Sequence, residues 1–154
     1  GGASTLMIAG GVKLEVGANG RRIFRASDEV WRGDIENQEE PQTIVWRRLA
    51  APPVGPFYRM AASQGDSDRV IFTGGGNNPY NYDGVGYNGA PAYPSDRAVG
   101  YSITEDTWTD LGAIPASMDH RGLLVGGQGY YILGGMGEHG EVLDRVTRLP
   151  LRAP

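Results

Sequence analysis

The sequence predicts an all-β protein built from repeated antiparallel units. An apolar stretch that ends in Gly-Gly occurs three times, as TLMIAGG (5–11), RVIFTGG (69–75) and GYYILGG (129–135). A Trp-x-x-Leu motif with a Pro beyond it occurs twice, as VWRRLAAPP (45–53) and TWTDLGAIP (107–115). Motifs that recur in the same order indicate one structural unit used repeatedly.

The landmarks recur at similar intervals along the chain. The Gly-Gly pairs are separated by 64 and then 60 residues, and the two Trp-x-x-Leu motifs by 62. An arginine that opens the next apolar stretch, Arg59 and then Arg121, also recurs after 62 residues. We expect Trp46 and Trp108 to pack between units and the two arginines to hydrogen-bond neighbouring turns. The glycines should lie where a tight turn or a close contact leaves no room for a Cβ atom.

Each unit divides into short strand-like pieces. The chain has 25 Gly and 10 Pro, and no stretch of useful length shows the 3.6-residue spacing of an amphipathic helix. The pieces are rich in β-branched and aromatic residues and are separated by turn residues, as strands are. In the middle unit they are RMAASQ (59–64), RVIFTG (69–74), AVGYSIT (98–104) and TWTDLG (107–112). Four antiparallel strands in a unit of this size are typical of a β-propeller blade.

The order of the motifs resembles the kelch repeat. The resemblance rests on the apolar stretch with Gly-Gly, the strand and acidic turn YSITEDTW (101–108), the Trp-x-x-Leu-x-x-x-Pro motif and the Arg that follows. It covers nearly the whole chain and implies a kelch-like β-propeller. The sequence departs from the family pattern in two respects. Its units run to 60–64 residues where kelch repeats have about 50, and the first unit has no clear Tyr-bearing strand.

Residues 1–154 are predicted to form a single kelch-like propeller segment that is incomplete on its own. With strands labelled a to d from the axis outward, 5–49 form a partial blade b-c-d, 59–112 a complete blade, and 121–149 a partial blade a-b-c. Propellers have at least about four blades. We therefore expect apolar flanks on the outer blades. The remaining blades would come from a parent chain, a second fragment or self-association.

Composition narrows the classes of partner. The chain has 14 Lys and Arg against 18 Asp and Glu and no basic run, which argues against nucleic acid. It has no Cys, which excludes disulfides, thiolate metal sites and cysteine nucleophiles. No apolar run reaches the roughly 20 residues that cross a bilayer, and no cofactor is expected. The composition leaves the compartment open, with a secreted or cell-surface protein favoured.

The b–c and d–a loops emerge on one face, where we expect a ligand to bind, because long loops tend to carry function. The longest is GGNNPYNYDGVGYNGAPAYPSD (75–96), whose Tyr and Asn residues suit stacking and hydrogen bonding with a sugar or a peptide. The alternative is an ordered loop whose tyrosines pack over the blade edge. The predicted ligand-binding residues are Phe57, Tyr58, Tyr80, Tyr82, Asp83, Tyr87, Asn88 and Tyr93.

Polar residues suited to catalysis lie in turns on the same face. Each of the two histidines follows an acidic residue, and the resulting candidates are Asp119, His120, Arg121, Glu138 and His139. The alternative is that both histidines are ordinary surface residues of turns. We predict no metal site, because such a site brings three or more ligands together.

Two further segments have simple interpretations. VKLEVGANGRRIF (12–24) predicts a β-hairpin with an Asn-Gly turn. Its Arg21-Arg22 pair could bind a carboxylate. ENQEE (36–40) is expected to be a solvated acidic loop.

Three classes of function fit these features. The first is a non-enzymatic module that presents the Tyr- and Asn-rich loop face to a protein segment or a glycan, which the kelch resemblance favours. The second is part of a carbohydrate-active propeller enzyme similar to a sialic-acid mutarotase. A copper oxidase similar to galactose oxidase is disfavoured, because its Tyr–Cys crosslink needs a Cys. The third is a structural surface repeat with no discrete ligand.

Overall fold

The computed structural model describes residues 4–35, 43–56, 58–65 and 68–151. Phe57 and the whole ENQEE loop (36–40), together with residues 1–3, 41–42, 66–67 and 152–154, lie outside the described residues. The described part contains twelve strands and no helix: β1 Ser4–Ala9, β2 Val12–Val16, β3 Arg22–Ala26, β4 Val30–Ile35, β5 Ile44–Arg48, β6 Ala61–Gln64, β7 Arg69–Thr73, β8 Ser95–Ser102, β9 Thr107–Ser117, β10 Leu124–Gly126, β11 Gly129–Leu133 and β12 Val146–Arg148.

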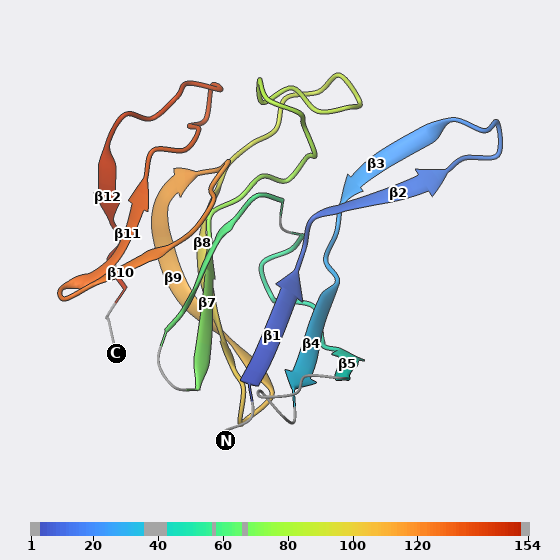
Figure 1. The fold of residues 1–154 in the computed structure, drawn as a ribbon. Coiled ribbons are helices and arrows are strands. Elements are labelled where there is room, and N and C mark those ends of the chain that lie inside the picture. The colour runs from blue at the N-terminus through green and yellow to red at the C-terminus, as the bar shows by residue number, and fades with distance from the viewer. Residues whose placement is uncertain (1–3, 36–42, 57, 66–67, 152–154) are drawn as a thin grey trace.

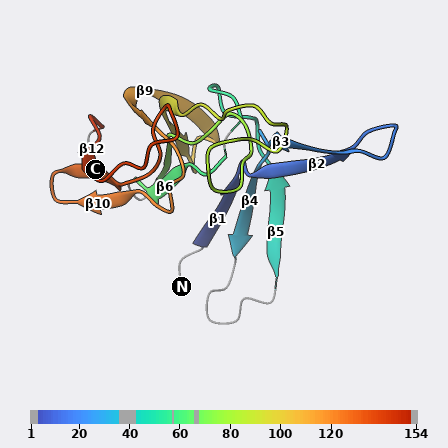
Figure 2. The same ribbon diagram turned by 90° about the horizontal axis from the view of Figure 1, so that it is seen from above.

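The strands form three antiparallel sheets in chain order, and a separate hairpin. The first sheet has the order β1-β4-β5, the middle sheet β6-β7-β8-β9 and the last sheet β10-β11-β12. Strands β2 and β3 form the hairpin, which projects away from the first sheet (Figures 1 and 2). The predictions of an all-β antiparallel fold and of a hairpin with its turn at Asn19-Gly20 are confirmed.

The Gly-Gly motifs end β1, β7 and β11 with the same backbone conformation. All six glycines have positive φ, between 64° for Gly134 and 103° for Gly135. A Cβ atom on Gly135 would lie 2.6 Å from His120 Cε1 and 2.8 Å from the Met118 carbonyl oxygen. Only glycine adopts this region freely. The repeated motif is therefore a backbone requirement of the fold, as predicted.

Apolar side chains fill the two spaces between the sheets. Between the first and middle sheets, the Trp108 ring packs at 5.7 Å from Phe72 and 5.1 Å from Tyr101, centroid to centroid. Trp108 Nε1 also donates to the Ala50 carbonyl at 2.9 Å. Between the middle and last sheets, the buried core is Ala61, Ile71, Ala98, Ile114, Leu123, Tyr130, Ile132 and Leu149. Trp108 thus packs between sheets, as predicted.

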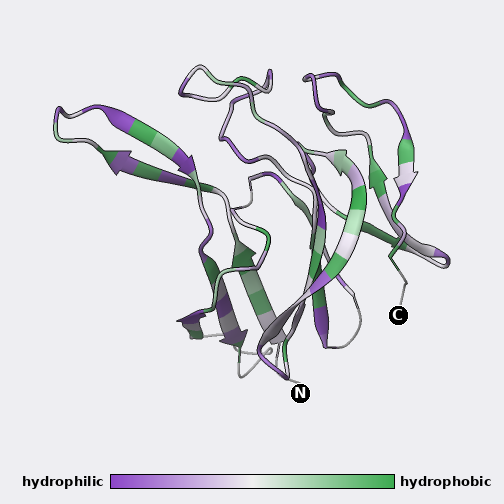
Figure 3. Cartoon of the chain, turned by 180° about the vertical axis from the view of Figure 1, so that it is seen from behind, coloured by the Kyte–Doolittle hydropathy of each residue, from purple (hydrophilic) through white to green (hydrophobic). Residues whose placement is uncertain are grey.

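The outer faces of the first and last sheets are apolar and exposed. Trp46 is 41% exposed, so the prediction that it packs between units is wrong within this chain. Leu6 lies on the same exposed face of the first sheet as Trp46, because both residues are paired with Gly33 on β4. On the last sheet Leu133 is 58% exposed. Figure 3 shows that the strands of these sheets carry both hydrophobic and hydrophilic residues. Within the described chain, no helix is long and apolar enough to span a membrane.

The middle sheet also differs in detail from the expected strands. β9 runs on to Ser117, beyond the predicted end at residue 112, and contains Pro115. Its pairing with β8 shifts between Ser95 and Arg97 and again between Ala98 and Val99. Because β9 is an edge strand with irregular pairing, it tolerates a proline that lacks an N–H donor.

Candidate functional site

The Tyr- and Asn-rich loop between β7 and β8 is held in shape by its own side chains. Asn78 Nδ2 donates to Asn88 Oδ1 at 2.9 Å and to the Ala90 carbonyl at 3.0 Å. Asn77 Oδ1 accepts the Tyr93 backbone N–H at 2.9 Å. The asparagines therefore act first as loop braces, as Asx side chains commonly do.

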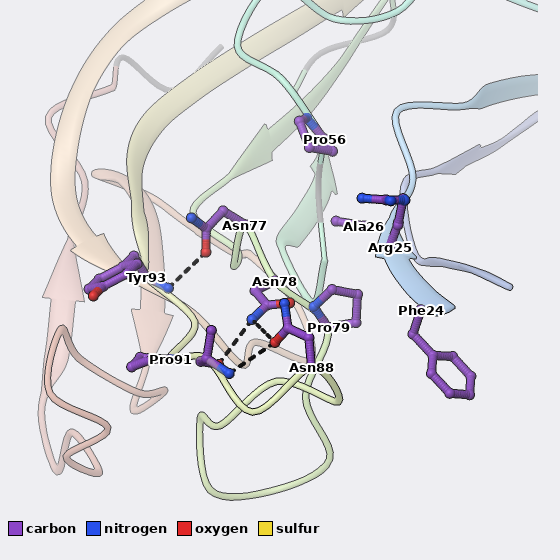
Figure 4. A pocket seen from close by; sticks show the side chains of 11 residues that line it. Phe24, Arg25, Ala26, Pro56, Asn77, Asn78, Pro79, Asn88, Pro91 and Tyr93 are labelled. Carbon is purple, nitrogen blue, oxygen red and sulfur yellow. Dashed lines mark hydrogen bonds between the residues drawn. The ribbon is translucent and has the colours of Figure 1, made fainter. Parts of the chain in front are cut away.

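A groove separates this loop from the β2–β3 hairpin, and we call it the hairpin groove. One hollow of about 450 Å³ is lined by Phe24, Arg25, Ala26, Pro56, Asn77, Asn78, Pro79, Asn88, Ala90, Pro91 and Tyr93. Figure 4 shows Phe24 and Arg25 on the hairpin side and the asparagines on the loop side. A second hollow of about 320 Å³ is lined by Arg21, Arg22, Ile23, Phe24, Arg25, Tyr87 and Asn88. Three lining residues are common to both, so the two hollows are contiguous.

Aromatic rings join the two sides of the groove. The Phe24 ring on the hairpin and the Tyr87 ring on the loop lie 4.6 Å apart, centroid to centroid, with an interplanar angle of 40°. Tyr87 is 51% exposed and Tyr93 54% exposed. Exposed ring surface beside hydrogen-bonding groups is suited to stacking on a sugar or a planar side chain.

The charges of the groove are mainly positive. Arg25 Nε binds Glu15 Oε2 at 2.9 Å, so its charge is partly compensated. Within the described part of the chain, the exposed guanidinium groups of Arg21 and Arg22 form no ion pair. The side-chain oxygens of Asn77 and Asn88 already accept hydrogen bonds from the loop. The groove therefore offers chiefly donors, which match a carboxylate or another acceptor-rich group.

The structure distributes the predicted ligand-binding residues unevenly. Tyr87, Asn88 and Tyr93 line the hairpin groove. Tyr82 and Asp83 are exposed on the loop but do not line it, and the Asp83 carboxylate accepts the Val85 N–H. Tyr58 and Tyr80 are buried.

Two hairpin residues, Phe24 and Arg25, line the groove beside this loop although they were not among the predicted ligand-binding residues. The only signal in the sequence was the length of the 12–24 insertion at the corresponding place in the first unit. Insertions at equivalent loops of neighbouring repeats emerge on the same face, so their spatial proximity could have been expected.

The buried tyrosines form a compact cluster beneath the loop. Tyr58 Oη donates to the Tyr80 carbonyl at 2.6 Å, and the two rings pack edge to face at 5.3 Å. The Arg59 guanidinium carbon lies 5.0 Å from the Tyr80 centroid, a cation–π contact. Burial, with a further contribution from the Asp119 charge, raises the pKa of Tyr80 to about 12. The Tyr80 hydroxyl has no hydrogen-bond partner among the described residues.

The Tyr58 hydroxyl has a hydrogen-bond partner and the Tyr80 hydroxyl has none among the described residues, so removing each should change the free energy of unfolding differently. Tyr58→Phe should lower the free energy of unfolding by about 0.5–1.5 kcal/mol, because a buried hydrogen bond is lost. Tyr80→Phe should cost nothing or stabilise slightly, because it removes an unpaired buried hydroxyl. Urea unfolding of the two variants checks the pair. An equal loss in both would mean that the Tyr80 hydroxyl has a partner.

Asp119 links two units of the repeat. Its Oδ1 atom binds Arg59 Nη1 and Arg121 Nη1, each at 3.0 Å. Both arginines therefore hold a turn, as predicted.

The structural repeat pairs these positions differently from the sequence motif. Arg59 corresponds to Asp119 in the structure, because both have positive φ, 53° and 62°. Each also follows a residue that forms an isolated antiparallel bridge with the residue directly after a Gly-Gly pair, Tyr58 with Gly76 and Met118 with Met136. Arg121 lies two residues beyond the equivalent position.

His120 is buried, which corrects the interpretation of both histidines as surface residues. It is 5% exposed, and its Nε2 atom lies 3.0 Å from Ser117 Oγ. Its backbone N–H donates to the Arg59 carbonyl at 3.0 Å. Its ring fits against Gly74 and Gly135, where a Cβ atom would clash with it. His120 therefore belongs to the packing of the repeat.

Burial lowers the pKa of His120 below its ordinary value of 6.5. The unfolded chain therefore binds a proton before the folded protein does. The contribution of the neutral His120 side chain to the free energy of unfolding should therefore be complete above pH 6.5. It should decrease as the pH falls from 6.5 to the lowered pKa of the folded state. His120→Gln should flatten this part of the pH profile of unfolding free energy, and the exposed His139→Gln should not. Equal slopes in the wild type and His120→Gln would contradict the assignment.

The other catalytic candidates do not converge. Glu138 and His139 are exposed in the turn before β12, and the His139 N–H donates to Glu141 Oε2 at 2.9 Å. Of the five candidates, only Asp119 and Arg121 are joined by an ion pair among the described residues. His120 lies between them in the sequence, but its side chain is buried. In the described ranges, no group of three or more His, Asp or Glu residues could hold a metal ion.

No family model and no curated protein matches the chain. Solved structures do match it. One, described as the structure of YjhT, superimposes with a TM-score of 0.60 at 16% sequence identity and covers 79% of this chain. The match takes in 35% of the YjhT chain, so this chain spans about a third of that protein's length. YjhT is a propeller-type protein, and the likeness concerns the fold alone. The described residues therefore have the fold of a β-propeller sector.

Proposed function

We propose that this chain is a non-enzymatic binding module whose hairpin groove holds a carboxylate-bearing segment of a glycan or a protein. One observation supports this proposal most strongly. Arg21 and Arg22 flank the contact between Phe24 and Tyr87, and neither arginine forms an ion pair among the described residues. The resemblance to kelch repeats, which are mostly interaction modules, supports the same proposal. The remaining blades of the propeller are proposed as its structural partner.

The recognition chemistry follows from the lining residues. A guanidinium group binds a carboxylate with two parallel N–H donors, which gives both affinity and direction. The exposed faces of Tyr87 and Tyr93 would stack on the apolar face of a sugar ring or on a peptide side chain. The amide donors of Asn77 and Asn88 would bind hydroxyl or carbonyl oxygens.

A double variant tests this proposal. Arg21→Ala with Arg22→Ala should weaken binding on the order of tenfold to a hundredfold, since charge-assisted hydrogen bonds are lost. Calorimetric titration with an oligogalacturonate and with a Glu-rich peptide identifies which source of carboxylates is preferred. The matched control is Arg145→Ala with Arg148→Ala, two exposed arginines near the last sheet. Binding of neither probe, or an equal loss in the control, would refute the proposal.

The second candidate is a carbohydrate-active propeller enzyme resembling a sialic-acid mutarotase. The ion-paired group of Arg59, Asp119 and Arg121 favours it, because a polar cluster at the start of the inner strands is where such a site would be built. His120 would not act as its acid or base, because its ring is buried. Asp119→Asn leaves the hairpin groove untouched, so a loss of sugar turnover in this variant would favour the enzyme.

A further inference from the structure

The hairpin groove follows an unpaired edge of β3. Residues 21–25 all line one of its hollows, and Phe24, Arg25 and Ala26 line the other. Figure 4 shows these three residues of β3 across the hollow from the loop. Successive side chains of a strand point to opposite faces, so a hollow lined by consecutive residues lies along the edge of that strand. No described strand other than β2 pairs with β3, and no residue of β2 lines either hollow.

The register of the hairpin shows which backbone groups of β3 point away from β2. At the turn end of the ladder, the Gly17 N–H donates to the Arg21 carbonyl at 3.0 Å. At the other end, the Ser27 N–H donates to the Gly11 carbonyl at 3.0 Å. Hydrogen-bonded pairs alternate with non-hydrogen-bonded pairs in an antiparallel ladder, so every second residue of β3 directs its N–H and C=O groups outward. The outward residues are Arg22, Phe24 and Ala26.

The outward backbone groups of β3 are unpaired. Among the described residues, no N–H or C=O group of Arg22, Phe24 or Ala26 forms a hydrogen bond on this side. A free edge of this kind promotes pairing with another strand. A second extended polypeptide carries donors and acceptors at the same spacing as β3, whereas a chain of sugar rings does not. The backbone of β3 therefore favours a protein segment as the ligand of the groove.

The side chains along this edge determine which protein segment fits. Arg21 and Arg22 lie at the turn end, where both are exposed and neither forms an ion pair among the described residues. Phe24 and Ala26 follow toward the other end and are apolar. Charge complementarity therefore places acidic side chains of the ligand at the turn end, with apolar or small side chains after them.

We propose that the hairpin groove binds an extended acidic peptide segment of a partner protein, which pairs with the free edge of β3 by β-augmentation. This inference rests on the proposed function and selects a protein segment over a glycan. The hairpin lies outside the three sheets of the propeller sector, so this pairing is separate from the completion of any blade.

Hydrogen exchange measured by NMR on the whole chain tests the proposal. The probe is a capped peptide of three glutamates followed by alternating valine and threonine. At saturating peptide, the amides of Arg22, Phe24 and Ala26 should exchange on the order of tenfold more slowly. The outward amides of β2, those of Val12, Leu14 and Val16, should exchange as before. The same peptide with every central amide N-methylated keeps its side chains and charges but should give no protection, because it has no ladder donors.

Two proline variants test the same edge from the protein side. Ala26→Pro removes one outward donor without breaking a bond to β2, and it should weaken binding of the peptide about tenfold. Val16→Pro is the matched control, because it removes an outward donor from the opposite edge of the hairpin and lines neither hollow. It should bind the peptide as the wild type does. The exchange rates of the wild type decide the question even if Ala26→Pro does not fold.

Calorimetric titration with the oligogalacturonate separates failure of this inference from failure of the proposed function. Unchanged exchange at Arg22, Phe24 and Ala26 while the peptide binds would overturn the pairing with β3 and leave the groove as a carboxylate site. Tighter binding of the oligogalacturonate than of the peptide would also overturn it, since the ligand would then be a glycan. Binding of neither probe would overturn both proposals.

Discussion

Trp108→Ala is expected to lower the free energy of unfolding by about 3–5 kcal/mol. The variant removes a ring that packs on Phe72 and Tyr101 and a hydrogen bond from Nε1 to the Ala50 carbonyl. These contacts join the first and middle sheets, and the remaining side chains would leave a cavity there. Chemical denaturation followed by circular dichroism measures the change.

Trp46 provides the matched control, because it occupies the equivalent place in the first unit. It lies on the outer flank and is 41% exposed. Trp46→Ala should therefore cost less than about 1 kcal/mol in the isolated chain. A loss of several kcal/mol from Trp46→Ala would mean that another surface covers this flank in solution. A loss below about 1 kcal/mol from Trp108→Ala would contradict its place in the core.

Gly135→Ala is expected to cost about 3–5 kcal/mol, from two additive causes. The residue has a φ of 103°, which strains any L side chain. Its new Cβ atom would also lie 2.6 Å from His120 Cε1, within a packed interior. Thermal and urea unfolding measure the loss.

Gly11→Ala separates these two causes. Gly11 has a similar φ of 91°, but no atom lies within 4 Å of the position that a Cβ would take. The control should therefore cost only the backbone strain, about 1–2 kcal/mol. Equal losses in the two variants would show that the contact with His120 does not contribute.

Local sequence patterns predicted much of the fold, because the repeat imposes the same physical requirement several times. Gly10, Gly74 and Gly134 mark strand ends in the sequence and have left-handed backbone in the structure. The Asn19-Gly20 turn is fixed by residues next to it, so the hairpin was equally predictable. The exposure of Trp46 was not predictable in this way, since burial of its ring would need a neighbouring sheet that the described residues do not supply.

The candidate site was harder to predict, because it combines segments that are distant in the sequence. Phe24 meets Tyr87 across 63 positions, and neither segment alone indicates the contact. The interpretation of His120 was wrong for a related reason. Its position in a polar turn suggested exposure, but the glycines that make room for its ring, Gly74 and Gly135, lie elsewhere in the chain.

An NMR titration shows directly whether the hairpin groove is the binding site. Backbone amide shifts would be followed as the preferred probe, an oligogalacturonate or a Glu-rich peptide, is added to the chain. The proposal predicts that the largest shifts fall in residues 21–26, 77–79, 87–88, 90–91 and 93, which line the groove. Shifts centred instead on residues 58–59 and 118–121 would contradict it and would favour a site at the Asp119 cluster.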